Sequence, residues 1–322
     1  MLTHANQLAE SGQYAALLEY LAAREETELA ESPTLALLCG IAHGRLGAHT
    51  TAKHWVGIAL DRARQRSDSA IETRAANARG AIALEAGRVQ EAELHFARAR
   101  ALAEREGDDA TLGRCSNNIG IVHAMQGRYA EALGAYTMAV AAFQQVGSRQ
   151  GVAEALHNLA KVYADQGDLQ AACETADNAV QEAEAAGDLT LAAQARAGRA
   201  EYRLLDGEAQ VARREIEAVL EAHRRLGDVV REAEDLRVLA GALAALGDPR
   251  AAETTLRKVL ERAEVLERPL LAAQAGRDLA HLLRKLGRAN EARDVAQTAR
   301  ARFQELGAEA ELKPLDALLA AC

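Results

Sequence analysis

Glycine recurs along this chain at a fixed spacing of forty residues. The first series consists of Gly47, Gly87, Gly127, Gly167, Gly207, Gly247 and Gly287, and Gly12 stands thirty-five residues before it. A second series with the same step contains Gly107, Gly147, Gly187, Gly227 and Gly307, and Glu267 occupies its one gap. A period of this length indicates a repeat protein, in which each unit packs mainly against its neighbours.

The two series predict where helices end. A helix commonly ends in a residue with a left-handed backbone, which glycine adopts without steric cost. Between the glycines, apolar residues follow helical spacing, as in the stretch from Ala155 to Tyr163. Each unit is therefore predicted to consist of two antiparallel helices, an A helix before the first-series glycine and a B helix after it.

Alanine occupies one position in every unit, five residues after the first-series glycine: Ala52, Ala92, Ala132, Ala172, Ala212, Ala252 and Ala292. Small residues at a fixed site let two helices approach closely. Because one helix pair cannot bury its apolar stripe alone, we expect the units to stack.

The composition agrees with a helical chain and narrows its function. Of 322 residues, 49% are hydrophobic, only 3% are aromatic, and four are proline. The net charge of −9 disfavours a non-specific nucleic-acid binder. Cys39, Cys115, Cys173 and Cys322 show no CxxC spacing, which favours free thiols in a reducing compartment. The sequence shows neither a secretion signal nor a membrane-spanning run, so we expect a cytoplasmic protein.

Two successive units carry a recognisable motif. One contains Asn118-Ile119-Gly120, Gln126-Gly127-Arg128-Tyr129, Glu131-Ala132-Leu133, Tyr136 and Ala139, and the next contains Asn158-Leu159-Ala160, Tyr163, Gly167-Asp168 and Ala172. This pattern resembles the tetratricopeptide (TPR) repeat over nearly the whole chain. The forty-residue period resembles the longer TPR variant of kinesin light chains and bacterial peptide-sensing or signal-transduction regulators.

The resemblance implies an all-α fold, a right-handed α-solenoid of about eight TPR-like helix pairs. We expect one domain over residues 1–322, with a degenerate first unit at 1–31 and a C-terminal capping helix at about 308–321. No sequence feature marks a domain boundary or a linker.

In TPR domains the A helices line a concave groove, and the resemblance implies the same here. The candidate partner-binding residues are Arg74, Asn77, Arg114, Asn117, Asn118, Glu154, His157, Asn158, Lys161, Arg237, Arg277 and His281. Asparagine offers a donor and an acceptor, so it can hold an extended peptide backbone irrespective of sequence. Arg114, His157 and Lys161 would select polar or acidic side chains. The alternative is that these asparagines are solvated or form hydrogen bonds between repeats.

Two arginines depart from the family pattern. Arg79 and Arg199 stand eight residues before a first-series glycine, where the family has a large apolar residue. Either the aliphatic stem packs while the head reaches a carboxylate or solvent, or the arginine binds a ligand.

Catalytic motifs are absent from the sequence, which contains no GxxxxGK[ST], GxSxG or HExxH. We expect no enzyme activity, cofactor or metal site. Arg62, Arg64 and Arg66 are predicted to lie on a solvated helix face, since a nucleic-acid role would lack aromatic partners.

The predicted function is a non-catalytic scaffold that binds a peptide segment or a partner helix in the groove. One alternative is the sensor part of a larger bacterial signalling system linked to an ATPase, a protease or a transcription factor. Another is a self-associating structural solenoid. The expected partner is a protein or peptide, not nucleic acid or a membrane, and a homo-oligomer stays open.

Overall fold

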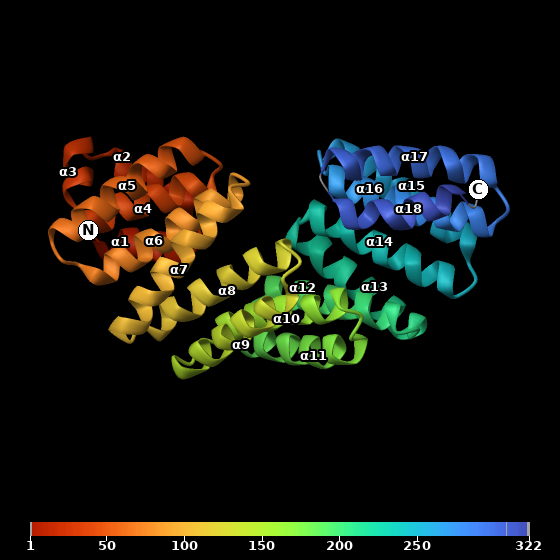
Figure 1. The fold of residues 1–322 in the computed structure, drawn as a ribbon, viewed down its shortest axis with the longest axis horizontal. Helices are drawn as coiled ribbons and strands as arrows, with labels where there is room; N and C mark the ends of the chain where they lie inside the picture. Colours follow the sequence, from red (N-terminus) through yellow and green to blue (C-terminus); the bar gives the residue numbers. More distant parts are fainter. Residues whose placement is uncertain (1, 307, 321–322) are drawn as a thin grey trace. The chain divides into compact units, whose positions relative to one another are not determined.

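The computed structural model describes residues 2–306 and 308–320, and the regular structure in these residues is entirely helical (Figure 1). The A helices are α4 (Pro33–Arg45), α6 (Ser69–Glu85), α8 (Asp109–Met125), α10 (Arg149–Asp165), α12 (Leu189–Leu205), α14 (Val229–Ala245) and α16 (Pro269–Lys285). The B helices are α5 (His49–Gln65), α7 (Val89–Glu106), α9 (Tyr129–Gln145), α11 (Leu169–Ala185), α13 (Ala209–Leu226), α15 (Pro249–Val265) and α17 (Ala289–Glu305). The predicted all-α solenoid of tandem helix pairs is confirmed.

The two ends of the chain complete this array. Helices α1 (Leu2–Glu10) and α2 (Tyr14–Ala22) form the short first pair. Helix α18 (Glu309–Ala320) matches the predicted capping helix, because its Leu315 and Leu318 are buried against Phe303 of α17. Gly307, Cys322 and the last residue of the predicted capping helix, Ala321, lie outside the described residues.

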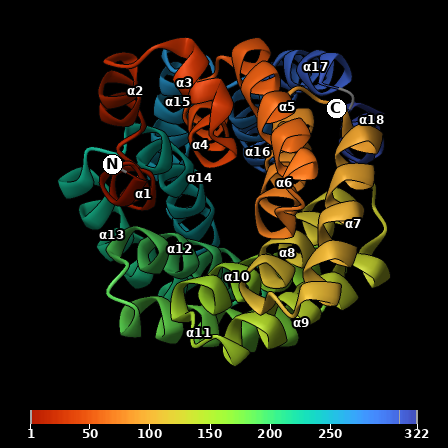
Figure 2. The same cartoon turned by 90° about the vertical axis from the view of Figure 1, so that its left-hand side faces the viewer.

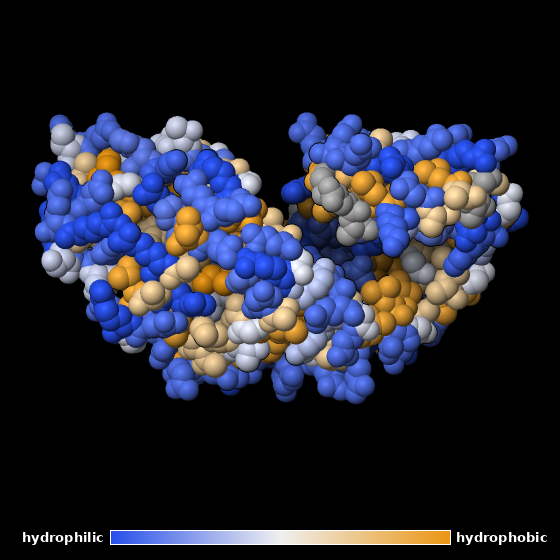
Figure 3. Space-filling model, in the orientation of Figure 1, coloured by the Kyte–Doolittle hydropathy of each residue, from blue (hydrophilic) through white to orange (hydrophobic). Residues whose placement is uncertain are grey.

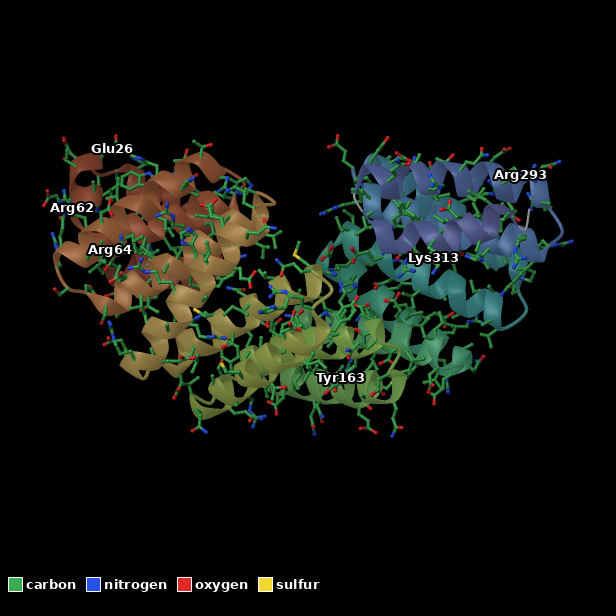
Figure 4. The ribbon with its side chains drawn as sticks, in the orientation of Figure 1. Glu26, Arg62, Arg64, Tyr163, Arg293 and Lys313 are labelled. Carbon is green, nitrogen blue, oxygen red and sulfur yellow. The ribbon has the colours of Figure 1, made fainter. Side chains whose placement is uncertain are left out.

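A short helix that was not predicted, α3 (Glu26–Glu31), lies between the first two pairs. Two arginines of the α5 region hold it in place: Arg62 donates to the backbone oxygen of Ala30 at 3.3 Å, and Arg66 donates to that of Glu31 at 2.8 Å. Arg64 and Arg66 are exposed, as predicted, whereas Arg62 is half-buried. Figure 4 labels Arg62 and, on α3, Glu26.

The turns explain the glycine series. Every described glycine of both series has a positive φ; at Gly167, for example, φ is 82°. Asp168 follows and accepts a hydrogen bond from the backbone N–H of Ala171, which caps the next helix. Ser67 and Glu267 adopt the same left-handed conformation at equivalent turns, with φ of 55° and 52°. The conformation of the turn is thus kept where glycine is absent.

The chain packs as two compact units, Met1–Val162 and Tyr163–Cys322. Within each unit, the core is a succession of small clusters between neighbouring helices, built around residues such as Trp55, Phe96 and Phe143 in the first and Ile216 and Leu256 in the second. Hydrophilic side chains dominate the face in Figure 3. That the whole chain is one domain stays a prediction.

Close contact between A and B helices depends on small residues. All seven alanines of the repeated position are fully buried. A Cβ added to Gly80 of α6 would lie 2.5 Å from the ring of Phe96 on α7, and one added to Gly120 of α8 would lie 2.6 Å from the ring of Tyr136 on α9. The small residue on one helix therefore makes room for the large one on its partner.

Candidate functional site

The N-terminal unit contains a groove with a volume of about 760 Å³. Helices α4, α6, α8 and α10 supply most of its lining, and Asn6 of α1, Phe96 of α7 and Phe143 of α9 also border it. Six of the predicted site residues lie in its lining: Arg74, Asn77, Arg114, Asn117, Asn118 and Glu154. The A helices thus bring these side chains together within one unit. That they bind a partner stays a prediction.

The groove asparagines bond to one another between successive repeats. The side-chain amide of Asn118 donates to Asn77 Oδ1, and that of Asn158 donates to Asn117 Oδ1, both at 3.0 Å. Asn117, only 4% exposed, also donates to Glu154 Oε1 at 3.4 Å. The two pairs have the same register, since a residue nine before one first-series glycine meets a residue ten before the previous one. Hydrogen bonds between repeats, the alternative left open by the sequence, are confirmed for these four residues.

These pairs leave part of each donor amide available. Asn118 and Asn158 each use one N–H for the neighbouring asparagine, and within the described residues neither their second N–H nor their side-chain oxygen forms a further bond. An asparagine amide has two donor hydrogens and one acceptor oxygen. Each therefore keeps one donor and one acceptor, which is what a peptide unit requires.

The rest of the groove mixes apolar and charged side chains. Ile41, Ala78 and Ile121 add apolar surface, and Arg45 and Glu85 add charges. Arg45 and Glu85 were not predicted, although both stand two residues before a first-series glycine. The predicted groove residues all stand six or more residues before that glycine.

Two family models named tetratricopeptide repeat match the sequence, over residues 71–145 and 152–186. The chain therefore contains tetratricopeptide repeats over these two stretches. The first match spans α6 to α9, which carry three of the four paired asparagines, and the second spans most of α10 and α11.

Solved structures share the fold of this TPR protein at low sequence identity. A STAND signal-transduction ATPase with a TPR sensor from Pyrococcus horikoshii is 16% identical, with a TM-score of 0.68 over 95% of this chain and 46% of that one. A Rap protein complexed with Competence and Sporulation Factor is 13% identical, with a TM-score of 0.66 over 99% and 96%.

The apo form of the quorum sensor NprR from B. thuringiensis is 14% identical, with a TM-score of 0.60 over 99% of this chain and 95% of that one. This chain spans about half the length of the STAND ATPase from Pyrococcus horikoshii. No curated protein sequence matches it.

Three further candidates lie on α10 of the TPR protein but outside the lining of the groove, namely His157, Asn158 and Lys161. Lys161 is exposed, whereas His157 and Asn158 are half-buried. Asn158 is connected to the groove through its bond to Asn117.

The C-terminal unit uses ion pairs at the same register. Arg237 of α14 pairs with Glu201 of α12 and, at 3.0 Å, with Asp278 of α16. Arg277 of α16 pairs with Asp278 and with Glu311 of α18. Burial would lower the pKa of Arg237, but the two carboxylates raise it above its usual range. Arg237 thus ties three A helices together, and Arg277 ties the last of them to the capping helix.

The third candidate of this unit, His281, is half-buried on α16. Burial lowers its pKa, so the ring is neutral at pH 7. His281 therefore adds no positive charge to that of Arg237 and Arg277.

Arg199 is satisfied within the protein. Its guanidinium donates to Asp177 Oδ1 at 2.6 Å and to Glu215, so the interpretation of a packed stem with a paired head is confirmed for this residue.

The buried thiols are poor nucleophiles. Burial raises the pKa of Cys39 to about 11 and that of Cys115 to about 12, so both stay protonated at neutral pH. Among the described residues, no three His, Cys, Asp or Glu side chains cluster as metal ligands would.

Within the described part of the chain, no helix is long and apolar enough to cross a membrane.

Proposed function

We propose that this TPR protein is a non-catalytic scaffold that holds an extended segment of a partner protein in the groove of residues 1–162. The observation that carries the proposal is the row of paired asparagines, Asn77 with Asn118 and Asn117 with Asn158, across three successive A helices. Each pair is pre-organised by its internal bond, so little side-chain entropy is lost on binding.

The spacing of the pairs suits an extended chain. Neighbouring packed helices lie roughly 10 Å apart, and an extended peptide rises about 3.3 Å per residue. Asn118 and Asn158 would therefore contact peptide units about three residues apart. Each would exchange hydrogen bonds through its remaining N–H and its oxygen, which gives grip without sequence choice. Ile41 and Ile121 would contact apolar side chains of the segment.

We place the peptide contacts in the N-terminal unit. In the C-terminal unit, the positions equivalent to Asn77 and Asn117 hold Arg237 and Arg277. Their guanidinium groups already bind carboxylates of neighbouring helices. To bind a peptide, these arginines would have to break their ion pairs. That would cost more free energy than peptide binding costs the asparagines of the N-terminal unit, which keep their bonds to one another.

The similar structures support this proposal. One of them is a Rap protein in complex with Competence and Sporulation Factor, and another is a quorum sensor. We propose that this chain likewise recognises a partner through its TPR fold. We further propose a bacterial, cytoplasmic protein whose partner is a protein or peptide rather than nucleic acid or a membrane.

A second candidate function is the sensor part of a larger signalling system. The observation that favours it is the TPR-sensor ATPase, of which this chain matches 46%. The reading frames beside the gene test it directly, because an adjoining ATPase, protease or transcription-factor frame is expected. Self-association, the third possibility, is tested by the molecular mass in solution.

The primary proposal is tested by selecting peptides from a random display library on the full chain. The best peptide, titrated into 15N-labelled protein, should shift the side-chain amide signals of Asn118 and Asn158. The signal of Asn178, exposed on α11, should stay in place. Selection of no peptide, or shifts that spare both groove asparagines, would contradict the proposal.

A further inference from the structure

Arg79 and Arg199 occupy equivalent positions in the repeat, eight residues before Gly87 and Gly207. Arg199 shows what satisfies an arginine at this position. Its Nε donates to Glu215 Oε1 at 2.8 Å, and its terminal nitrogen lies 2.6 Å from Asp177 Oδ1. Glu215 comes from α13, the B helix of the same forty-residue repeat, and Asp177 comes from α11, the B helix of the preceding repeat.

Both carboxylates are missing at the equivalent positions around Arg79. Glu215 stands eight residues after Gly207, and the residue eight after Gly87 is His95. Asp177 stands ten residues after Gly167, and the residue ten after Gly47 is Gly57. A neutral ring and a glycine thus replace the two anions.

Arg79 makes no ion pair or hydrogen bond with any described residue, and its buried Nε is unpartnered. It lies on α6, between α5 with Gly57 and α7 with His95 (Figure 2). Burial lowers the pKa of His95, and the positive charge of Arg79 lowers it further. A half-buried cation without an acceptor is unfavourable.

The space beside Arg79 is open on the side of Gly57. A Cβ built on Gly57 would meet no atom within 4 Å, so the position that Asp177 holds in the other unit is vacant here. Other charges near this position are those of Arg98, which acts on His95, and of Lys53, which acts on Glu91. Glu91 pairs with Arg88 and, at 3.7 Å, with His95. Glu91 forms no ion pair with Arg79.

We propose that Arg79, together with the notch at Gly57, is a docking point for the carboxylates of an acidic segment of a partner protein. The chemistry is that of the Arg199 site, with the aspartate supplied from outside instead of from a neighbouring helix. Gly57, Arg79 and His95 do not line the asparagine groove, so this contact is separate from it and does not rest on the function proposed for that groove.

The first experiment follows the Nε–H signals of Arg79 and Arg199 by 15N NMR on the full chain. The probe is a synthetic peptide of alternating alanine and glutamate, and its control carries glutamine in place of glutamate. We expect a saturable shift of the Arg79 signal with the glutamate peptide alone, while the signal of Arg199 stays in place. Arg79→Gln identifies the signal.

Three results of this titration would overturn the proposal. They are no shift at Arg79, an equal shift with the glutamine peptide, and a shift produced by inorganic phosphate but not by glutamate. The last would assign the position to phosphate groups instead of carboxylates.

The second experiment supplies the missing anion internally. Gly57→Asp places a carboxylate where Asp177 stands in the other unit, so it should raise the melting temperature and weaken binding of the glutamate peptide roughly tenfold or more. In an Arg79→Gln background, the same substitution should raise the melting temperature less, because only the gain from replacing a helix glycine remains. If Gly57→Asp changes neither the melting temperature nor peptide binding, the vacancy beside Arg79 is not a carboxylate site.

Discussion

A buried histidine–aspartate pair stands in the C-terminal unit at positions that other units fill with apolar residues. His223 Nδ1 lies 2.6 Å from Asp235 Oδ2, both side chains are almost fully buried, and Nε2 has no partner among the described residues. The positions equivalent to His223 are Ala63, Ala103, Phe143, Ala183, Ala263 and Phe303. The pair therefore puts two polar side chains between α13 and α14 where other units have apolar ones.

This pair makes stability depend on pH. Burial raises the pKa of Asp235 to about 6, although its hydrogen bond with His223 opposes the rise. In the unfolded chain the pKa is near 4, so protonated Asp235 contributes stability that is full below about pH 4 and is lost as the pH rises through about 6. From pH 4 to 7 we expect a loss of roughly 1–3 kcal/mol in the free energy of unfolding.

Urea denaturation across this pH range measures that loss. The control is the double variant His223→Ala and Asp235→Ala, which puts alanine at both positions, as Ala183 and Ala195 do one repeat earlier. The same pH dependence in the variant as in the wild type would rule out Asp235 as its source.

Some residue-scale features were readable from the sequence, and others were not. The sequence alone indicated that Asn118 and Asn158 are candidates for holding a peptide backbone. The sequence does not say whether an amide bonds to a ligand or to the next repeat, because both need the same donor and acceptor. The His223–Asp235 pair left a signal, two polar residues in apolar columns, but only the structure brings them together.

At the scale of helices, two glycines in neighbouring helices have opposite roles. A Cβ on Gly151 of α10 would lie 2.5 Å from the ring of Phe143, whereas one on Gly134 of α9 would meet nothing within 4 Å. Gly151→Ala should lower the free energy of unfolding by about 1–3 kcal/mol through overpacking. Gly134→Ala should raise it by roughly 0.5–1 kcal/mol, because alanine favours the helix. Thermal denaturation of both variants measures the difference, and equal signs would contradict this packing.

Glu267 follows the C-cap of α15 in a left-handed conformation that is strained for a residue with a side chain, with a φ of 52°. Glu267→Gly should therefore stabilise the protein by roughly 1 kcal/mol. Glu261→Gly, inside the same helix and exposed, should destabilise it by a similar amount. Melting temperatures that move in the same direction would disprove the strain assigned to Glu267.

Helix boundaries were largely predictable because the chain marks them with glycine. Helix α3 escaped prediction because no periodic signal marks it. Its six residues are too few to be stable alone, and it depends on Arg62 and Arg66, which lie more than thirty residues further along the chain.

At the scale of the whole molecule, the two units tie their A helices together in different ways. Amide pairs serve in the N-terminal unit and ion pairs in the C-terminal unit, at the same register of the repeat. Neutral amides keep free donors and acceptors, whereas the paired guanidinium groups are already occupied. This difference is why we assign peptide binding to the first unit.

The most direct test of this assignment is titration calorimetry of a peptide selected on the full chain. The double variant Asn118→Ala and Asn158→Ala should weaken binding by roughly 1–3 kcal/mol, the range for lost buried hydrogen bonds. A modest fall in melting temperature should accompany it, because each amide also bonds to a neighbouring asparagine. Asn178→Ala, on the exposed face of α11, should bind as the wild type does. Unchanged affinity in the double variant would contradict peptide binding by the asparagine pairs.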